Sequence, residues 1–184
     1  FQVLMPDCRG HGMSEGDYIS MGWNDRLDVM GWIDDILARD ANAEIVLYGV
    51  SMGGATVMMT AGEDLPENVK AIVEDCGYSS IWDEFSYQLE SVFGLPDFPI
   101  MHFASMVTRI RAGYSLREGN AVEQVAKSKT PLFFIHGDAD TFVPYSMLDQ
   151  VYNAATVEKE KLIVPGAGHG EAAAVAKDAY WDAV

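Results

Sequence analysis

The sequence has few cysteines, few basic residues and no long apolar run. Cys8 and Cys76 are the two cysteines among 184 residues, which is too few for a disulfide scaffold, and they fit no metal-ligand spacing. Lysine and arginine number 12 against 28 acidic residues, and the net charge of −16 would repel a nucleic-acid backbone. The apolar runs are far shorter than the roughly 20 residues that cross a bilayer. We therefore expect no nucleic-acid partner, no metal, no signal peptide and no transmembrane helix.

The chain begins inside an apolar run, residues 1–5, without an initiator methionine. Such a run is typical of a strand, so we expect a fragment of a longer protein. This leaves two localisations open, cytoplasmic or anchored to a membrane through a preceding segment. A strand without its neighbour exposes unpaired backbone groups, and self-association through sheet edges is the expected consequence.

Short apolar runs alternate with helical patterns along the chain. Strands are predicted at residues 1–5, 44–48, 69–74, 132–135 and 161–164. Each is largely apolar rather than alternating, which is typical of a strand covered on both faces by helices. Helices are predicted at 51–61, at 144–155, and where Trp23, Leu27, Met30, Ile33 and Leu37 recur every three or four residues. This alternation predicts an α/β fold with a mostly parallel sheet and helices on both faces.

Residues 77–129 interrupt that alternation. The segment is rich in aromatic residues and prolines, and it is far longer than the roughly 2–6 residues of a usual strand-to-helix connection. We predict two or three helices that form a cap over the sheet. The expected organisation is a core with the nucleophile at 1–76, a helical cap at 77–129, and a core with acid and histidine loops at 130–184.

Residues 44–55 combine a strand, a Gly-x-Ser-x-Gly turn and the start of a helix. This pattern predicts that Ser51 is a nucleophile on a tight turn, where Gly49 and Gly53 leave no room for side chains two residues to either side. The backbone N–H of Met52, at the helix N-terminus, is the expected oxyanion donor.

A serine nucleophile needs a base and an orienting acid, in the chain order Ser, Asp, His for a turn of this kind. Residues 132–144 end a predicted strand in an acidic loop, and residues 162–170 end the next one in a glycine loop that carries His169. Both loops lie at strand C-termini, where open parallel sheets gather catalytic groups.

These motifs resemble the α/β-hydrolase superfamily, specifically bacterial serine hydrolases of the peptidase S9/S33-like and cell-surface-hydrolase type. Residues 7–16 are similar to their loop after the fourth strand, and residues 137–144 to their acid loop. The resemblance implies that Ser51 is the nucleophile, Asp140 the acid and His169 the base. It also implies that a third strand and the second oxyanion donor precede this sequence.

Other polar residues compete for these roles. Asp75 ends a predicted strand and is an alternative acid, whereas Asp138 is expected to hold the acid loop through nearby backbone groups. His11 is interpreted as structural and His136 as a core histidine, and the sequence suggests no partner for His102.

The cap supplies candidate substrate contacts. Tyr78, Trp82 and, in the acid loop, Phe142 are predicted to bind substrate, although aromatic residues of a lid also pack as core. Arg109 and Arg111 bind a substrate carboxylate or form a solvated helix face.

The predicted function is hydrolysis of a carboxylic ester or similar small acyl substrate through an acyl-enzyme, without metal or organic cofactor. Two alternatives stay open: a serine peptidase of S9/S33 type, and a non-catalytic hydrolase-like fragment or binding module.

Overall fold

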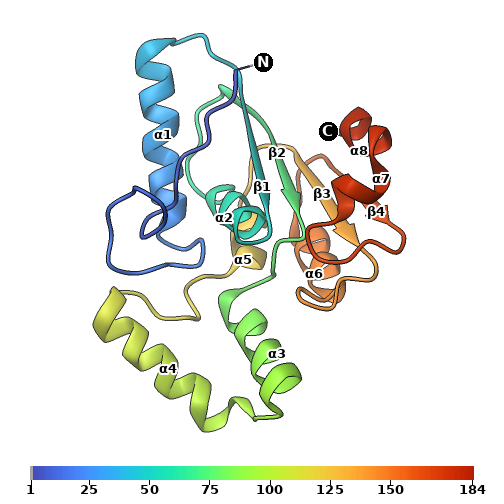
Figure 1. Ribbon diagram of the computed structural model, residues 1–184. Helices are drawn as coiled ribbons and strands as arrows, with labels where there is room; N and C mark the ends of the chain where they lie inside the picture. The colour runs from blue at the N-terminus through green and yellow to red at the C-terminus, as the bar shows by residue number, and fades with distance from the viewer. Residues whose placement is uncertain (1) are drawn as a thin grey trace.

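A parallel sheet forms the centre of the structure (Figure 1). The computed structural model describes residues 2–184. The strands are β1 (Ile45–Val50), β2 (Val69–Asp75), β3 (Leu132–Gly137) and β4 (Lys159–Val164), and they pair in the order β1-β2-β3-β4. The predicted strands at 44–48, 69–74, 132–135 and 161–164 are confirmed, each within a few residues.

The strand predicted at residues 1–5 is wrong for the part that the structure describes. Residues 2–7 have no regular secondary structure and are exposed. A strand persists only where a neighbouring strand pairs with its backbone N–H and C=O groups, and within residues 2–184 this segment has no strand beside it. Phe1 lies outside the described residues.

Two core clusters lie on the two faces of the sheet. Ile72 of β2 and Phe134 of β3 pack with α1 (Asp25–Arg39), α2 (Met52–Thr60), α5 (Ala121–Val125) and α6 (Ser146–Ala154). Their chain neighbours Val73 and Ile135 pack with α7 (Ala172–Ala176) and α8 (Asp178–Ala183), which lie on the side of the molecule away from α1 (Figure 1). Because successive side chains of a strand point to opposite faces, one apolar run supplies both clusters. Helices on both faces are therefore confirmed.

Strand β1 departs from that expectation. Its residues are alternately buried and exposed, and Val46, Tyr48 and Val50 are between 37% and 53% exposed. Helix α7 contacts β3 and β4, and α8 reaches β1 at Tyr48, whose hydroxyl lies 2.7 Å from that of Tyr180, so this part of the sheet is only partly covered. The expectation of helical cover on both faces of every strand is wrong at β1.

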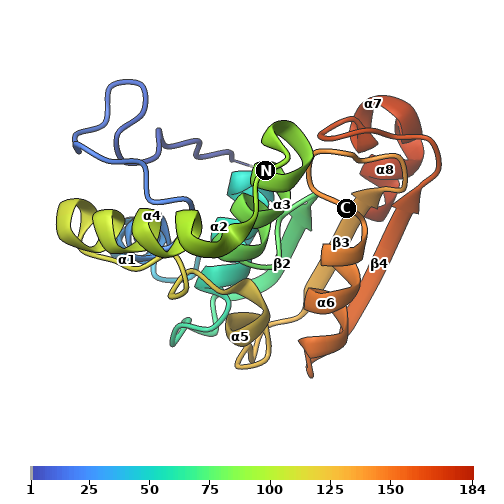
Figure 2. The ribbon, with the colours of Figure 1, turned by 90° about the horizontal axis from the view of Figure 1, so that it is seen from below.

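The segment between β2 and β3 contains α3 (Ile81–Phe93), α4 (Asp97–Ala112) and α5. The hydroxyl of Ser80 accepts the Asp83 N–H at the start of α3, and Gly94 ends that helix in the left-handed conformation. Helices α3 and α4 contact each other and project from the sheet, whereas α5 packs on α2 and α6 (Figures 1 and 2). The prediction of two or three helices in this segment is confirmed, whereas their role as a cap and its limits as a separate domain stay predictions.

The helices of residues 2–184 are too short or too polar to span a bilayer, including α4 with its 16 residues.

Candidate active site

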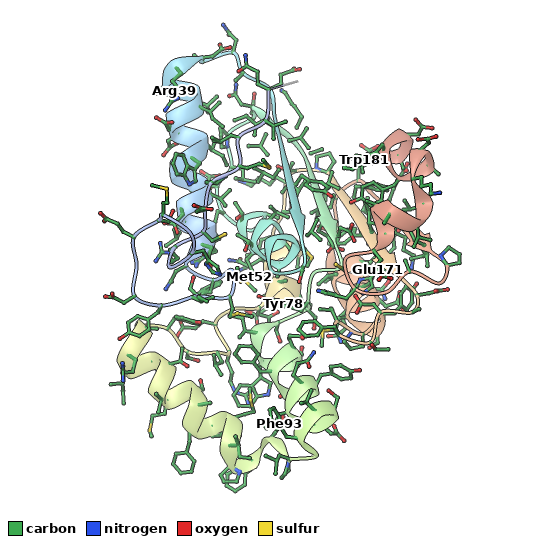
Figure 3. The ribbon with its side chains drawn as sticks, in the orientation of Figure 1. Arg39, Met52, Tyr78, Phe93, Glu171 and Trp181 are labelled. Atoms are coloured by element: carbon green, nitrogen blue, oxygen red, sulfur yellow. The ribbon has the colours of Figure 1, made fainter. Side chains whose placement is uncertain are left out.

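Ser51 occupies a strained turn between β1 and α2. Its backbone angles are φ 57° and ψ −119°, a combination that residues with a Cβ rarely adopt and that costs about 1–3 kcal/mol. The turn is held on both sides, because Ser51 N–H donates to the carbonyl of Asp75 (2.8 Å) and Ala55 N–H donates to the carbonyl of Ser51 (3.0 Å). Helix α2 begins at Met52 (Figure 3). The Met52 amide therefore belongs to the helix N-terminus, where N–H groups have no intrahelical partner.

The glycines around Ser51 differ in how much room a side chain would have. A Cβ added to Gly49 would lie 2.1 Å from the carbonyl oxygen of Gly53, so no side chain fits there. A Cβ on Gly53 would meet nothing within 4 Å, and one on Gly54 would lie 3.0 Å from the Asp75 oxygen. The expectation of a steric requirement holds at Gly49 and is wrong at Gly53.

Ser51, His169 and Asp140 form one line of hydrogen bonds. Ser51 Oγ lies 2.7 Å from His169 Nε2, and His169 Nδ1 lies 2.8 Å from Asp140 Oδ2. The three residues follow β1, β4 and β3 at the same end of the sheet. With the ring proton on Nδ1, Nε2 is free to accept the serine proton. The side chain of His169 is 25% exposed, whereas the Asp140 carboxyl is wholly buried.

The acid loop wraps its own backbone around Asp140. Oδ1 accepts the N–H groups of Phe142 and Val143, both at 2.9 Å, and Oδ2 also lies 3.4 Å from His136 Nε2. Burial alone would raise the pKa of Asp140, but these hydrogen bonds, together with the one from His169, bring it well below its usual range. The hydrogen bond to Asp140 in turn raises the pKa of His169, against the effect of burial. The carboxylate therefore stays ionised and favours the protonated imidazole.

Asp75, the alternative acid, is hydrogen-bonded to Tyr180 rather than to His169. Asp75 Oδ2 accepts the hydroxyl of Tyr180 at 2.8 Å, Asp75 Oδ1 has no partner within residues 2–184, and burial raises the pKa of this carboxyl. Asp138 Oδ1 accepts the N–H of Gly166 at 2.6 Å. Asp138 thus bonds to backbone as expected, and the backbone group belongs to the histidine loop, so this carboxylate joins the acid loop to the histidine loop.

The other histidines have separate surroundings. His11 Nδ1 lies 3.1 Å from the Arg9 carbonyl in the glycine-rich loop, and His102 packs edge-on against Trp82 and Phe98. His136 is fully buried with Nε2 2.9 Å from the Val143 carbonyl. Its Nδ1 has no partner among the described residues.

Of the three aromatic residues predicted to bind substrate, the structure places one beside His169. Phe142 is 52% exposed, and its ring centroid lies 4.8 Å from that of His169. Tyr78 is buried with its hydroxyl donating to the Met21 carbonyl, and Trp82 is buried beneath the Arg117 guanidinium.

The two cap arginines, Arg109 and Arg111, are exposed on α4. Arg111 Nε lies 3.4 Å from the hydroxyl of Tyr18, in a loop that precedes α1. The placement of both side chains fits a solvated helix face.

Sequence reasoning missed two contributions to this site. Cys76, directly after β2, has its sulfur within 4.8 Å of both an Asp140 oxygen and a His169 nitrogen. Helix α3 holds the acid loop, since Tyr87 Oη donates to the Thr141 carbonyl (3.0 Å) and Gln88 Nε2 to the Phe142 carbonyl (2.7 Å). The position of Cys76 at the end of a strand could have indicated that it lies near the site. Nothing in the sequence indicated the contacts from α3.

The sequence profile described as "X-Pro dipeptidyl-peptidase (S15 family)" matches residues 1–115, more than half of the chain. The chain belongs to this family. Among curated proteins it is 27% identical to the uncharacterized protein YqkD of Bacillus subtilis (strain 168), over 92% of this chain and 56% of YqkD. It is 28% identical to the uncharacterized protein YfhR of Escherichia coli (strain K12), over 94% of this chain and 54% of YfhR. This S15-family chain thus spans about half the length of these relatives.

Solved structures with the same fold include esterases and peptidases. The esterase Pf2001 of Pyrococcus furiosus superposes with a TM-score of 0.71 at 19% identity, over 96% of this chain and 66% of the esterase. The acylaminoacyl peptidase of Pyrococcus horikoshii gives 0.60 at 19% identity, over 82% and 24%. An alpha-beta serine hydrolase homologue from Coxiella burnetii gives 0.55 at 18%, over 89% and 59%. The predicted membership of the α/β-hydrolase superfamily, with a partial form of its fold, is confirmed.

Proposed function

We propose that this chain is the part of a serine hydrolase that carries its triad, and that Ser51 attacks the carbonyl carbon of a carboxylic ester or similar small acyl group. The observation that supports this is the continuous line of hydrogen bonds from Ser51 Oγ through His169 to Asp140. As the bond from Oγ to carbon forms, His169 Nε2 takes the hydroxyl proton. It then gives this proton to the leaving alcohol, which leaves an acyl group on Ser51.

Water completes the cycle by the same route. His169 removes a proton from water, the resulting hydroxide attacks the acyl carbon, and the carboxylic acid leaves as Ser51 regains its proton. Asp140 keeps the imidazole in the tautomer with the proton on Nδ1 and stabilises its charged form, in keeping with the raised pKa of His169. The Met52 amide donates to the oxygen that becomes negative.

An ester or small acyl substrate is our first choice because the aromatic surface beside His169, the half-exposed Phe142 ring, suits an apolar acyl group. A serine peptidase is the second candidate. It is supported by the name of the matching family and by the acylaminoacyl peptidase among the solved structures.

Labelling with a fluorophosphonate tests whether the nucleophile is live. We expect the probe to modify the chain and Ser91→Ala, whose serine is exposed on α3, and to leave Ser51→Ala and His169→Ala unlabelled. Equal labelling of Ser51→Ala would refute Ser51 as the nucleophile. If no form were labelled, including a chain extended to the length of its relatives, a binding module would be favoured. Turnover of p-nitrophenyl acetate against an Xaa-Pro p-nitroanilide then separates the two substrate classes.

A further inference from the structure

A buried thiol accompanies two members of the triad. Cys76 follows β2, Asp140 follows β3 and His169 follows β4, and because these strands are parallel neighbours, the residues after them meet at one edge of the sheet. One sulfur, one carboxylate oxygen and one ring nitrogen lie within 4.8 Å of one another. Cys76 is 1% exposed, and the proposed hydrolysis gives its thiol no role.

These three atoms are the ligand types that zinc binds in proteins. With bond lengths of about 2.0–2.3 Å, a tetrahedral Zn²⁺ holds its ligands roughly 3.3–3.8 Å apart. Because the three atoms lie up to 4.8 Å apart, the most widely separated pair would have to close by about 1.0–1.5 Å. We propose that Cys76, Asp140 and His169 form a binding site for Zn²⁺, and that the bound ion inhibits the hydrolase. Inhibition rests on the proposed function, whereas metal binding does not.

Binding at this site is a ligand exchange without any change of oxidation state. The sulfur–zinc bond forms as the Cys76 thiol releases its proton to solvent, and water fills the fourth position. If the ion takes His169 Nδ1, the proton on that nitrogen also leaves and the hydrogen bond to Asp140 is replaced. If it takes Nε2, the lone pair that accepts the Ser51 proton is used. In either arrangement His169 can no longer act as the base.

The partly exposed member of the set is the base itself. The side chain of His169 is 25% exposed, whereas the carboxyl of Asp140 is wholly buried. An ion therefore reaches the site from the side of His169 and Ser51, where substrate also binds. We expect substrate and Zn²⁺ to compete.

The first test measures turnover of an activated ester against increasing ZnCl₂, with recovery after EDTA. The matched pair is Cys76→Ala and Cys8→Ala, since Cys8 is the other free cysteine and lies in the loop at residues 7–16. Removing a group that merely orients a ligand costs about 10- to 100-fold in metal affinity. We therefore expect Cys76→Ala to need at least about tenfold more Zn²⁺ for half inhibition, and Cys8→Ala to match the unmodified chain. Equal sensitivity of both variants would refute the site.

The second test reads the metal without activity. Co²⁺ bound by a thiolate gives a sulfur-to-cobalt charge-transfer band, which we expect from the unmodified chain and from Cys8→Ala, and which should be lost in Cys76→Ala and in the closer isostere Cys76→Ser. Thermal melting shows whether Cys76→Ala or Cys76→Ser fails to fold. The cobalt spectrum of the variant that does fold then tests the site. No band from the unmodified chain would refute the site. A cysteine-dependent band from a chain that shows neither ester turnover nor fluorophosphonate labelling, also when it is extended to the length of its relatives, would overturn the proposed function and leave the metal site standing.

Discussion

The two glycines that flank Ser51 provide a matched pair of mutations. Gly49→Ala places a methyl group 2.1 Å from the carbonyl oxygen of Gly53, 2.3 Å from its carbon and 2.7 Å from the Gly54 nitrogen. All three are backbone atoms of the first turn of α2, so no side-chain rotation relieves the overlap. Gly53→Ala adds the same methyl group to the same turn and meets nothing within 4 Å.

The expected magnitudes follow from this difference. Overpacking of this kind typically costs about 1–3 kcal/mol, because the backbone has to shift. In a chain of this length 1 kcal/mol changes Tm by about 2–4 °C, so Gly49→Ala should melt about 2–12 °C lower. Gly53→Ala should be neutral or stabilising by up to about 0.5–1 kcal/mol, since alanine has the higher helix propensity.

Activity gives an independent measure. The backbone shift forced by Gly49→Ala moves Ser51 relative to His169, and a displacement of about 1 Å can cost about 100-fold in rate. We expect that loss in ester turnover at a temperature where the variant is folded, with Gly53→Ala close to the unmodified chain. Thermal unfolding and turnover of both variants would refute the reasoning if Gly49→Ala were harmless, or if Gly53→Ala were equally damaging.

Four further predictions concern ionisation and assembly. Turnover should fall as pH drops through the pKa of His169, with a midpoint above about 6.5, because the bond to Asp140 raises that pKa and only the neutral ring accepts a proton; a pH-independent rate would contradict it. Asp140→Asn should cost about 10⁴-fold in kcat and Asp75→Asn far less, and the reverse order in steady-state kinetics would reassign the acid. Burial raises the pKa of Glu74 well above its ordinary value. The unfolded chain therefore loses the Glu74 proton near pH ~4.3, while the folded chain retains it. As a result, the free energy of unfolding falls as pH rises above that value. Urea unfolding at pH 5 and 8 should show that Glu74→Gln lessens this fall, and an unchanged pH dependence would argue against it. Light scattering at rising concentration should show self-association through the edge of β1 that no strand of residues 2–184 covers, and a constant monomer mass would exclude it.

The sequence predicted those parts of the site that depend on short motifs. A strand, a turn and a helix in one stretch of chain predicted Ser51, loops after apolar strands predicted the segments of Asp140 and His169, and the structure brings these three side chains together. Cys76 lies close to Asp140 and His169 only because of the register of β2 against β3, in which Asp75 lies opposite Ile135. Hydrophobic periodicity indicates that strands exist, but it contains no information on their register.

The same limit explains the error at β1. The run of residues 45–50 is as apolar as a strand covered on both faces, and composition does not tell which neighbouring element covers each face. The exposed side chains of Val46 and Val50 follow from the packing of α7 on β3 and β4, while α8 reaches β1 at Tyr48. That is a property of the tertiary structure.

The contact between α3 and the acid loop has a consequence for how this site can evolve. Tyr87 and Gln88 donate to the carbonyl oxygens of Thr141 and Phe142, so the clamp recognises main chain and is indifferent to which residues stand there. The position of Asp140 therefore does not depend on the Phe142 side chain through these contacts. Under the proposed function, exchange of residue 142 would therefore alter the surface that packs against His169 while the main-chain clamp keeps Asp140 in place, so acyl selectivity could change without loss of the acid's position.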